Sequence, residues 1–280
     1  MIKLIGIDID GTLLDDNRYL SDKTAEALSW ANSKGALIVL ASGRPYTKTI
    51  DEFYQKMGIT KGYYVAYNGE AIYDIKTKKC IYQNSITKSD IDYFYPIVLN
   101  TLKDNNLLDE TSLYVYQDNI DSNYNTIIKA LSINEYTRIE ELNNHIIIKK
   151  VSTLSDILIA HKFMLGLNPK YVMDIYHQLF NKLNDKYTIT TSMACFVEVL
   201  KKNIDKYDAL LKICEIDSIK SNEIMGIGDS INDLSMVSNS AIGIAMGNSK
   251  QEVKDKASFV TKTNNESGIY FAIEKYKDLF

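Results

Sequence analysis

The chain has 280 residues, a length that allows one large domain or two. Its residues are 45% hydrophobic and 24% charged, a composition that is typical of folded proteins and excludes global disorder. A formal net charge of −4 gives no reason to expect nucleic acid as the main partner. No apolar run reaches the roughly 20 residues of a membrane span. The three cysteines are scattered and form no CxxC pair, which predicts reduced thiols. A cytoplasmic protein is therefore expected.

The first part of the chain alternates between short apolar runs and amphipathic segments. Strands are predicted where the apolar runs lie and helices between them, with strands at 3–10 and 36–42 and helices at 21–35 and 43–58. The first helix has Ser21 as N-cap and Gly35 as C-cap. Strand–helix–strand order with continuously apolar strands favours right-handed βαβ units in a parallel sheet. Two more strands are predicted around the Asn68-Gly69 turn.

The pattern changes near residue 84 and returns after about residue 202. Residues 84–201 contain amphipathic helices and alternating strands, which are typical of an α+β domain. After them the earlier order resumes, with predicted helices at 205–216 and 230–240 and predicted strands at 223–229, 241–248 and 257–261. The predicted fold class is therefore α/β, a Rossmann-like parallel-sheet core of residues 1–83 and 202–280 with an inserted α/β domain at 84–201.

Two carboxylates follow the first predicted strand at an unusual spacing. Asp8 and Asp10 are two residues apart, so on a strand their side chains point to the same side. At roughly 4 Å, two such charges repel by about 4 kcal/mol at an effective dielectric constant near 20, so a proton or a metal ion is expected between them. Ser42-Gly43 and Asp229 end two further predicted strands. Because ligands of open parallel sheets bind beyond the carboxyl ends of the strands, these residues predict one shared site.

Four short motifs follow one another along the chain: DIDGTL at 8–13, ASGR at 41–44, Lys206 ahead of an ALL helix, and GDSIND at 228–233. Together they resemble the four ordered motifs of the haloacid dehalogenase (HAD) superfamily. The midchain insertion and the C-terminal IAMGN stretch resemble its Cof-type sugar-phosphatase branch. The resemblance covers essentially the whole core and implies a HAD-like fold in which residues 84–201 form an α/β cap that selects the substrate. It also implies a phosphoric monoester hydrolase that uses Mg²⁺ and forms an aspartyl-phosphate intermediate. Its implied substrates are small phosphorylated metabolites, with sugar phosphates as the leading class.

The resemblance implies a role for each motif residue. Asp8 would be the nucleophile that takes the phosphoryl group, and Asp10 the general acid to the leaving oxygen and then the general base to water. The implied Mg²⁺ ligands are Asp8, Asp229 and Asp10, the last through its carbonyl. Asp233 would orient Lys206 or support the metal. The residues implied to contact the phosphate are Ile9, Ser42, Gly43, Lys206 and Asn232.

Several of these positions also have a purely structural interpretation. Ser42 is expected to cap the helix that follows it, where backbone N–H groups would also favour a phosphate. Arg44 is expected to shape the turn. Lys206 is preferred over its neighbours Lys201 and Lys202, because it alone stands where the family lysine stands, directly ahead of the ALL helix.

Two other functions are compatible with these residues. A phosphomutase or phosphotransferase of the same superfamily would return the phosphoryl group to a substrate, and a phosphate-binding signalling module would bind without turnover. Asp10 disfavours the module, since a long-lived phosphoaspartate gains nothing from an acid–base group two residues away. The three histidines, His145, His161 and His177, all lie in the insertion. No histidine accompanies the core motifs, so a phosphohistidine mechanism is not expected, and the three residues are expected to be at the surface or partly buried. The sequence carries no signal for an oligomeric state.

Overall fold

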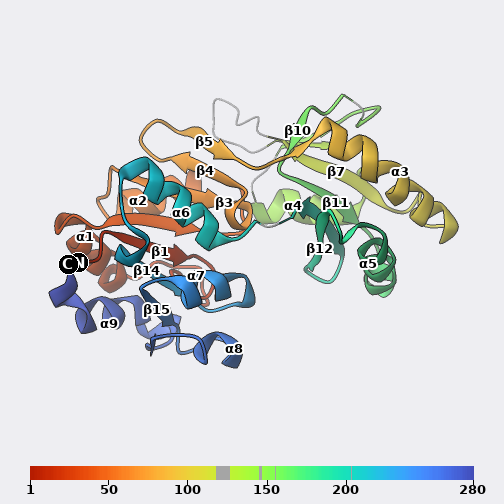
Figure 1. Cartoon of the computed structure of the whole chain (residues 1–280). Coiled ribbons are helices and arrows are strands. Elements are labelled where there is room, and N and C mark those ends of the chain that lie inside the picture. Colours follow the sequence, from red (N-terminus) through yellow and green to blue (C-terminus); the bar gives the residue numbers. More distant parts are fainter. Residues whose placement is uncertain (118–126, 145–146, 155, 203) are drawn as a thin grey trace. The chain divides into compact units, whose positions relative to one another are not determined.

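The computed structural model describes residues 1–117, 127–144, 147–154, 156–202 and 204–280 (Figure 1). The chain divides into two compact units. The first unit is formed by Met1–Gln83 together with Ile204–Phe280, and the second by Asn84–Asn203. The first unit is therefore built from both ends of the chain, and the second is inserted between them. No helix among the described residues is long and apolar enough to cross a membrane.

An eight-stranded sheet with the order β16-β15-β14-β1-β2-β3-β4-β5 organises the first unit. Its strands are β1 (Leu4–Asp8), β2 (Leu37–Ala41), β3 (Gly62–Ala66), β4 (Ala71–Asp74), β5 (Lys79–Gln83), β14 (Ile224–Gly228), β15 (Ile242–Ala245) and β16 (Phe259–Val260). The strands from β16 to β3 run parallel, and β4 and β5 continue the sheet antiparallel. Every residue of β1, β2, β3 and β14 is buried, which explains their apolar sequences. The predicted α/β class with a parallel core sheet is confirmed.

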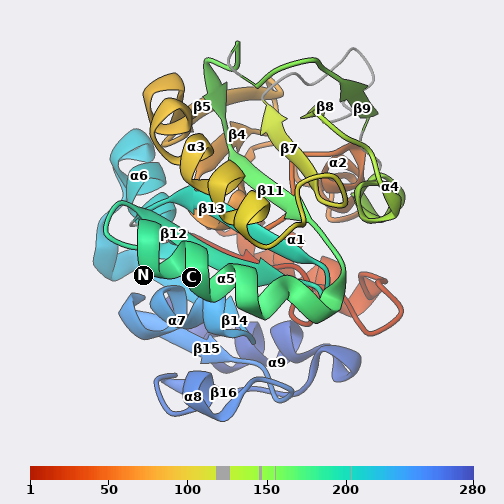
Figure 2. The same ribbon diagram turned by 90° about the vertical axis from the view of Figure 1, so that its right-hand side faces the viewer.

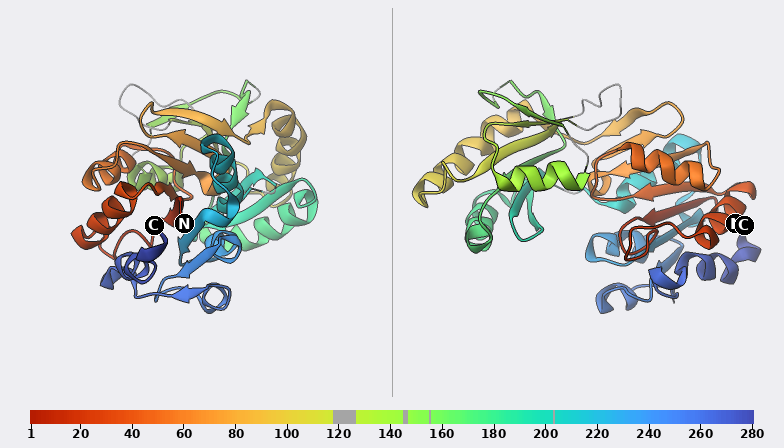
Figure 3. Two further views of the ribbon diagram at one scale, coloured as in Figure 1. Left: turned by 60° about the vertical axis from the view of Figure 1, so that its left-hand side comes forward. Right: turned by 180° about the vertical axis from the view of Figure 1, so that it is seen from behind.

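Helices cover both faces of this sheet, with α6 and α7 in front of it in Figure 1 and α1, α2 and α9 on the other face in Figure 3. The helices of the first unit are α1 (Asp22–Ser33), α2 (Lys48–Lys56), α6 (Lys206–Asp217), α7 (Leu234–Asn239), α8 (Gln251–Lys254) and α9 (Gly268–Lys275). Leu210 of α6 packs with Leu4 and Val39 of the sheet in one apolar core. This packing fixes the start of α6 near the ends of β1 and β2.

Capping differs between the first two helices of the core. Ser21 is the N-cap of α1 as predicted, and its Oγ accepts a hydrogen bond from the backbone N–H three residues on, at 3.2 Å. The helix predicted at 43–58 begins only at Lys48, so the expectation that Ser42 caps it is wrong. Pro45 disfavours the helical conformation for the residue before it, which excludes a helix that runs on from residue 43, and the observed N-cap is Thr47.

The second unit contains a six-stranded sheet with the order β12-β13-β11-β7-β8-β9 (Figure 2) and a separate strand pair, β10-β6. Its elements are β6 (Ile86–Thr87), α3 (Lys88–Asp104), β7 (Ser112–Gln117), β8 (Ile127–Ala130), α4 (Glu135–Asn144), β9 (Ile147–Lys150), β10 (Ile159–Ala160), β11 (Lys162–Gly166), α5 (Pro169–Leu183), β12 (Tyr187–Ser192) and β13 (Phe196–Lys201). The large sheet is antiparallel except for the β8–β9 pair. Apolar side chains of α3 and α5 pack with Leu113, Phe163 and Val197 of this sheet, so the unit has a core of its own.

One histidine of the second unit departs from the expectation. His161 is fully buried rather than at the surface or partly buried. It lies between β10 and β11, and its backbone N–H donates to the carbonyl of Tyr116 in β7 at 2.8 Å, directly beside the β7–β11 pairing. His177 is exposed on α5 as expected, and His145 lies outside the described residues.

Asp90 ties the start of α3 to two strands of the second unit. Its carboxylate accepts hydrogen bonds from the N–H of Thr87 at 2.8 Å, from Nζ of Lys201 at 2.6 Å and from the hydroxyl of Tyr187 at 2.9 Å. Burial alone would raise the pKa of Asp90. The hydrogen bonds, from Lys201 foremost, outweigh burial and lower this pKa to about 2.

Asp90→Asn is expected to lower the free energy of unfolding by about 1–2 kcal/mol near pH 7, because charge-assisted hydrogen bonds are lost. The folded-state pKa lies below the unfolded value of about 3.9, so this contribution is complete above that value and is lost as the pH falls toward 2. Urea unfolding followed by circular dichroism should show a difference from the wild type that disappears in acid. Asp92→Asn, which removes an exposed partner of Lys88 on the same helix, is the control and should change little. A difference of equal size at neutral and acidic pH would contradict this role.

Candidate active site

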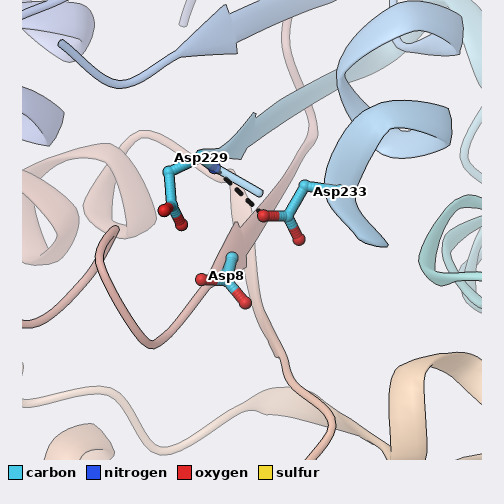
Figure 4. Close-up of side chains that lie close together, drawn as sticks. All are labelled: Asp8, Asp229 and Asp233. Carbon is cyan, nitrogen blue, oxygen red and sulfur yellow. Dashed lines mark hydrogen bonds between the residues drawn. The ribbon is translucent and has the colours of Figure 1, made fainter. Parts of the chain in front are cut away.

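The predicted site residues gather at the carboxyl ends of three neighbouring core strands. Asp8 is the last residue of β1, Ser42 directly follows β2, and Asp229 directly follows β14. A cavity of about 180 Å³ opens there, lined by Asp8, Asp10, Ser42, Gly43, Arg44, Ser230 and Asn232. Figure 4 shows the carboxylates of Asp8, Asp229 and Asp233 close together. The site thus lies where open parallel sheets bind their ligands.

Lys206 lies among these carboxylates. Its Nζ is 2.5 Å from Oδ1 of Asp8 and 2.5 Å from Oδ1 of Asp233, and its side chain is fully buried. The side chain comes from the first residue of α6. Burial lowers the pKa of Lys206, but the two carboxylates outweigh it and hold this pKa above its ordinary value, so the ammonium stays charged. The rivals Lys201 and Lys202 belong to the second unit and bind partners there.

Asp233 uses both of its carboxylate oxygens. Oδ1 accepts from Lys206, while Oδ2 accepts from the N–H of Asp229 at 3.0 Å, drawn in Figure 4, and from the N–H of Ser230 at 2.9 Å. Asp233 ends the short helix η3 (Ile231–Asp233), so the helix predicted at 230–240 is divided into η3 and α7. Of the two roles expected for Asp233, its contacts favour orienting Lys206.

Gly11 makes room for the carboxylate of Asp229. Gly11 has φ +82°, a conformation that side chains rarely adopt, and a Cβ there would lie 2.8 Å from Oδ2 of Asp229. Thr12 Oγ1 donates to Oδ1 of Asp229 at 3.0 Å, and Ser230 Oγ donates to Oδ2 at 3.1 Å. Burial raises the pKa of Asp229, and the neighbouring carboxylate of Asp233 raises it further. The turn after β1 and the turn after β14 therefore hold this carboxylate together.

The acidic cluster fits a divalent cation. Asp8, Asp229 and Asp233 each place one carboxylate oxygen within 4.8 Å of the others, and Lys206 brings one positive charge against these three negative charges. Burial, followed by the carboxylate of Asp233, raises the pKa of Asp8, so a further cation would stabilise the ionised site. Asp233 already accepts three hydrogen bonds, from Lys206 and from two backbone N–H groups, whereas Asp229 accepts only one hydroxyl hydrogen bond on each oxygen. Asp8 and Asp229 are therefore the carboxylates with the most acceptor capacity left to hold it. Oxygen donors suit a hard cation such as Mg²⁺.

Arg44 is a site residue whose side-chain role the sequence interpretation missed. Its Nε donates to Oδ2 of Asp10 at 2.8 Å and its Nη2 donates to Oδ1, which makes a bidentate pair. Shaping the turn, the role expected for Arg44, therefore accounts for only part of its contacts. The backbone of the turn is held by Ser42, whose buried Oγ accepts from the N–H of Arg44 at 3.2 Å. One sequence signal could have predicted this contact: Arg44 closes the ASGR motif, directly after a predicted strand.

Three further positions are defined by amide or backbone contacts. Asn232 donates through Nδ2 to Oδ1 of Asn68 at 3.0 Å, which brings Asn68, predicted only as part of a turn, to the site. Gly43 lies beside the same amide, since a Cβ there would be 3.2 Å from Nδ2 of Asn68. Ile9 is fully buried, so its side chain belongs to the core and its backbone is the part that can face a phosphate.

Comparisons with known proteins agree with this geometry. A family model described as haloacid dehalogenase-like hydrolase matches residues 5–273. The chain belongs to this family. The 5-amino-6-(5-phospho-D-ribitylamino)uracil phosphatases YcsE and YwtE of Bacillus subtilis are 28% and 29% identical to it, over 98% of this chain and 96% and 98% of theirs. The crystal structure of a haloacid dehalogenase-like hydrolase from Bacteroides thetaiotaomicron matches with a TM-score of 0.82 and 28% identity, covering 98% of this chain and 99% of the other.

The predicted family and enzyme class are therefore confirmed. This haloacid dehalogenase-like hydrolase is an enzyme of the phosphatase type, and its relatives of similar length carry phosphatase names. The family match spans both segments of the first unit and the inserted second unit.

Proposed function

We propose that this haloacid dehalogenase-like hydrolase is a Mg²⁺-dependent phosphatase of small phosphate monoesters, with sugar phosphates as the leading class. The observation that carries the proposal is the buried carboxylate of Asp8, held 2.5 Å from Lys206 at the wall of a cavity of about 180 Å³. Such a carboxylate is placed to attack phosphorus, and the ammonium to offset the charge that is transferred. The relatives named as phosphatases of a phosphoribitylamino-uracil support a small phosphorylated metabolite as substrate.

In the first step, an oxygen of Asp8 attacks the phosphorus in line with the ester bond, which breaks and leaves the phosphoryl group on Asp8. The leaving alkoxide takes a proton from Asp10. Arg44 contacts both carboxylate oxygens of Asp10, so before this step one of these oxygens has to leave Arg44 and carry a proton, which then passes to the leaving oxygen. The proton that Asp10 takes from water in the second step restores this protonated form. Lys206 offsets charge on the phosphoryl oxygens, and the amide of Asn232 binds one of these oxygens in substrate and transition state alike.

In the second step, water attacks the phosphorus while Asp10, now a carboxylate, takes the proton of the water. The bond between the phosphorus and Asp8 breaks, inorganic phosphate leaves, and the carboxylate of Asp8 is restored. Mg²⁺, held by Asp8, Asp229 and the carbonyl of Asp10, would withdraw negative charge from the phosphoryl oxygens when bound.

Phosphate release from a panel of phosphate monoesters tests this function. EDTA is expected to lower kcat/KM by at least about 10²-fold, because a metal supplies several kcal/mol of charge stabilisation, and added Mg²⁺ is expected to restore it. Full activity in metal-free enzyme would contradict the assignment of the metal site. Phosphate binding without release from any ester, in the presence of Mg²⁺, would favour the signalling module, and an isomerised phosphate ester would favour the mutase.

We also propose that the second unit is the cap that selects the leaving group. It is a compact unit with its own apolar core, inserted within the unit that carries the site. Replacing residues 84–203 by the corresponding segment of YcsE is expected to transfer the YcsE ranking of phosphate esters to the chimera, because the cap would contact the leaving group. Activity on p-nitrophenyl phosphate controls for a folded first unit. A chimera that keeps the ranking of the parent enzyme would show that the first unit selects the substrate.

A further inference from the structure

A left-handed turn between β3 and β4 has no role in the function proposed so far. Tyr67, Asn68 and Gly69 form the short helix η1 (Tyr67–Gly69), and all three have positive φ, at +52°, +60° and +117°. Two consecutive non-glycine residues in this region are unfavourable, and such a conformation persists only where the surrounding structure holds it. The contacts of the turn show what holds it.

The backbone of the turn binds the segment that follows β2. The N–H of Asn68 donates to the carbonyl of Ser42 at 2.9 Å, and the N–H of Tyr67 donates to the carbonyl of Arg44 at 3.3 Å. The turn is therefore fixed against the same residues that line one wall of the cavity.

The turn also packs against the residue that precedes the buried lysine. A Cβ on Gly69 would lie 2.1 Å from the carbonyl oxygen of Asp205, so the two backbones are in close contact. Asp205 is the N-cap of α6, with its carboxylate accepting from the N–H of Asp208 at 2.9 Å, and Lys206 follows it directly. The turn thus contacts the segments that present both Ser42 and Lys206.

The side chain of Asn68 reaches a third segment, the turn that carries Asn232. Oδ1 of Asn68 accepts from Nδ2 of Asn232 at 3.0 Å. An asparagine amide has a donor end and an acceptor end, and a carbonyl oxygen can accept only from the donor end. The NH₂ group of Asn232 has two hydrogens, so one can bind Asn68 while the other is left to donate to a phosphoryl oxygen in the cavity that Asn232 lines. A flipped amide would instead turn its carbonyl oxygen toward the phosphate and repel it.

We propose that Asn68 is a positioning residue that selects the donor end of the Asn232 amide for the substrate phosphate. The proposal rests on the proposed function, because it names a residue that acts through one of the phosphate-binding groups. The role requires the left-handed backbone, which carries the Asn68 amide to the cavity wall beside Gly43.

Asn68→Gly tests the proposal, because glycine keeps the left-handed backbone and removes only the amide. We expect KM for p-nitrophenyl phosphate and the inhibition constant of inorganic phosphate each to rise about tenfold, with kcat within about twofold, since a contact made equally to substrate and transition state changes KM alone. Asn106→Gly is the matched control, because Asn106 also has positive φ, at +56°, and is exposed outside the cavity lining. It should change neither constant.

A double-mutant cycle separates positioning from an independent contact. Because Asn68 acts through Asn232, adding Asn68→Gly to Asn232→Ala should raise KM and the inhibition constant no further than Asn232→Ala alone. Additive effects in the double variant would overturn the proposal. If the Tm shows that the glycine variant folds poorly, Asn68→Ser replaces it. This variant also lacks the amide, so the same rise in KM and in the inhibition constant is expected.

The outcomes also separate this proposal from the function on which it rests. Unchanged constants in Asn68→Gly, in an enzyme that hydrolyses esters and is inhibited by phosphate, would overturn the positioning role alone. A wild-type enzyme that neither releases phosphate from esters nor binds inorganic phosphate would overturn both.

Discussion

Asp8→Asn is expected to lower kcat by at least about 10⁴-fold while leaving the enzyme folded. An amide is too weak a nucleophile to form the acyl phosphate, and Lys206 keeps its second carboxylate partner, Asp233, at 2.5 Å. In the presence of EDTA the melting temperature should stay the same or rise. Burial and the carboxylate of Asp233 raise the pKa of Asp8, so its charged form opposes folding at neutral pH, and the substitution removes that charge.

Asp22→Asn is the matched control for this variant. Asp22 lies in α1 of the same unit, where its exposed carboxylate pairs with Lys56 at 2.8 Å, outside the cavity lining. The Asp22→Asn substitution removes the same charge as Asp8→Asn and should leave kcat unchanged. Turnover retained in Asp8→Asn would place the nucleophile on another residue.

Asp10→Asn is expected to separate the two chemical steps. Loss of general acid–base help typically costs 10²–10⁴-fold, and about that loss is expected in the hydrolysis of the aspartyl phosphate, where water needs a base. A nitrophenolate leaves readily without a proton, so p-nitrophenyl phosphate should give a fast burst of about one nitrophenolate per site, followed by slow turnover. A sugar alkoxide leaves poorly without a proton, so a sugar phosphate should react slowly from the start. Stopped-flow absorbance measures the nitrophenolate burst, and phosphate release measures the reaction of the sugar phosphate.

The two substrates serve as each other's control in this experiment. Asparagine keeps one side-chain oxygen that can accept from Arg44, so the variant loses the proton carrier while one bond of the pair can persist. Equal slowing of both substrates, with no burst and with phosphate and Mg²⁺ binding intact, would contradict the assignment of Asp10 as acid and base.

Much of the site could be predicted because its residues stand at strand ends. Continuous apolar runs identified β1, β2 and β14, and the carboxyl ends of parallel strands meet at one edge of a sheet. Asp8, Ser42 and Asp229 were therefore expected together, and the structure brings them to one edge. Lys206 is expected from its motif, and the structure places its side chain between the carboxylates of Asp8 and Asp233.

Contacts between side chains far apart in the sequence could not be predicted in this way. Arg44 and Asp10 are 34 residues apart, and Asn68 and Asn232 are 164 apart, so no local period connects them. Periodicity shows which face of an element is apolar but does not name the partner that a polar side chain will meet. Part of the late start of α2 has a local cause, since Pro45 disfavours the helical conformation at Arg44 although the amphipathic pattern favours a helix from residue 43.

Locating the phosphoryl group in the trapped intermediate tests the central claim most directly. Asp10→Asn enzyme, mixed with p-nitrophenyl phosphate and quenched in acid during the slow phase, should contain an acyl phosphate. Borohydride converts an aspartyl phosphate to homoserine, and peptide mass spectrometry then finds the modified position. We expect homoserine at position 8 and at no other aspartate. Homoserine at another aspartate, or a phosphoryl group on a hydroxyl or imidazole side chain, would contradict it.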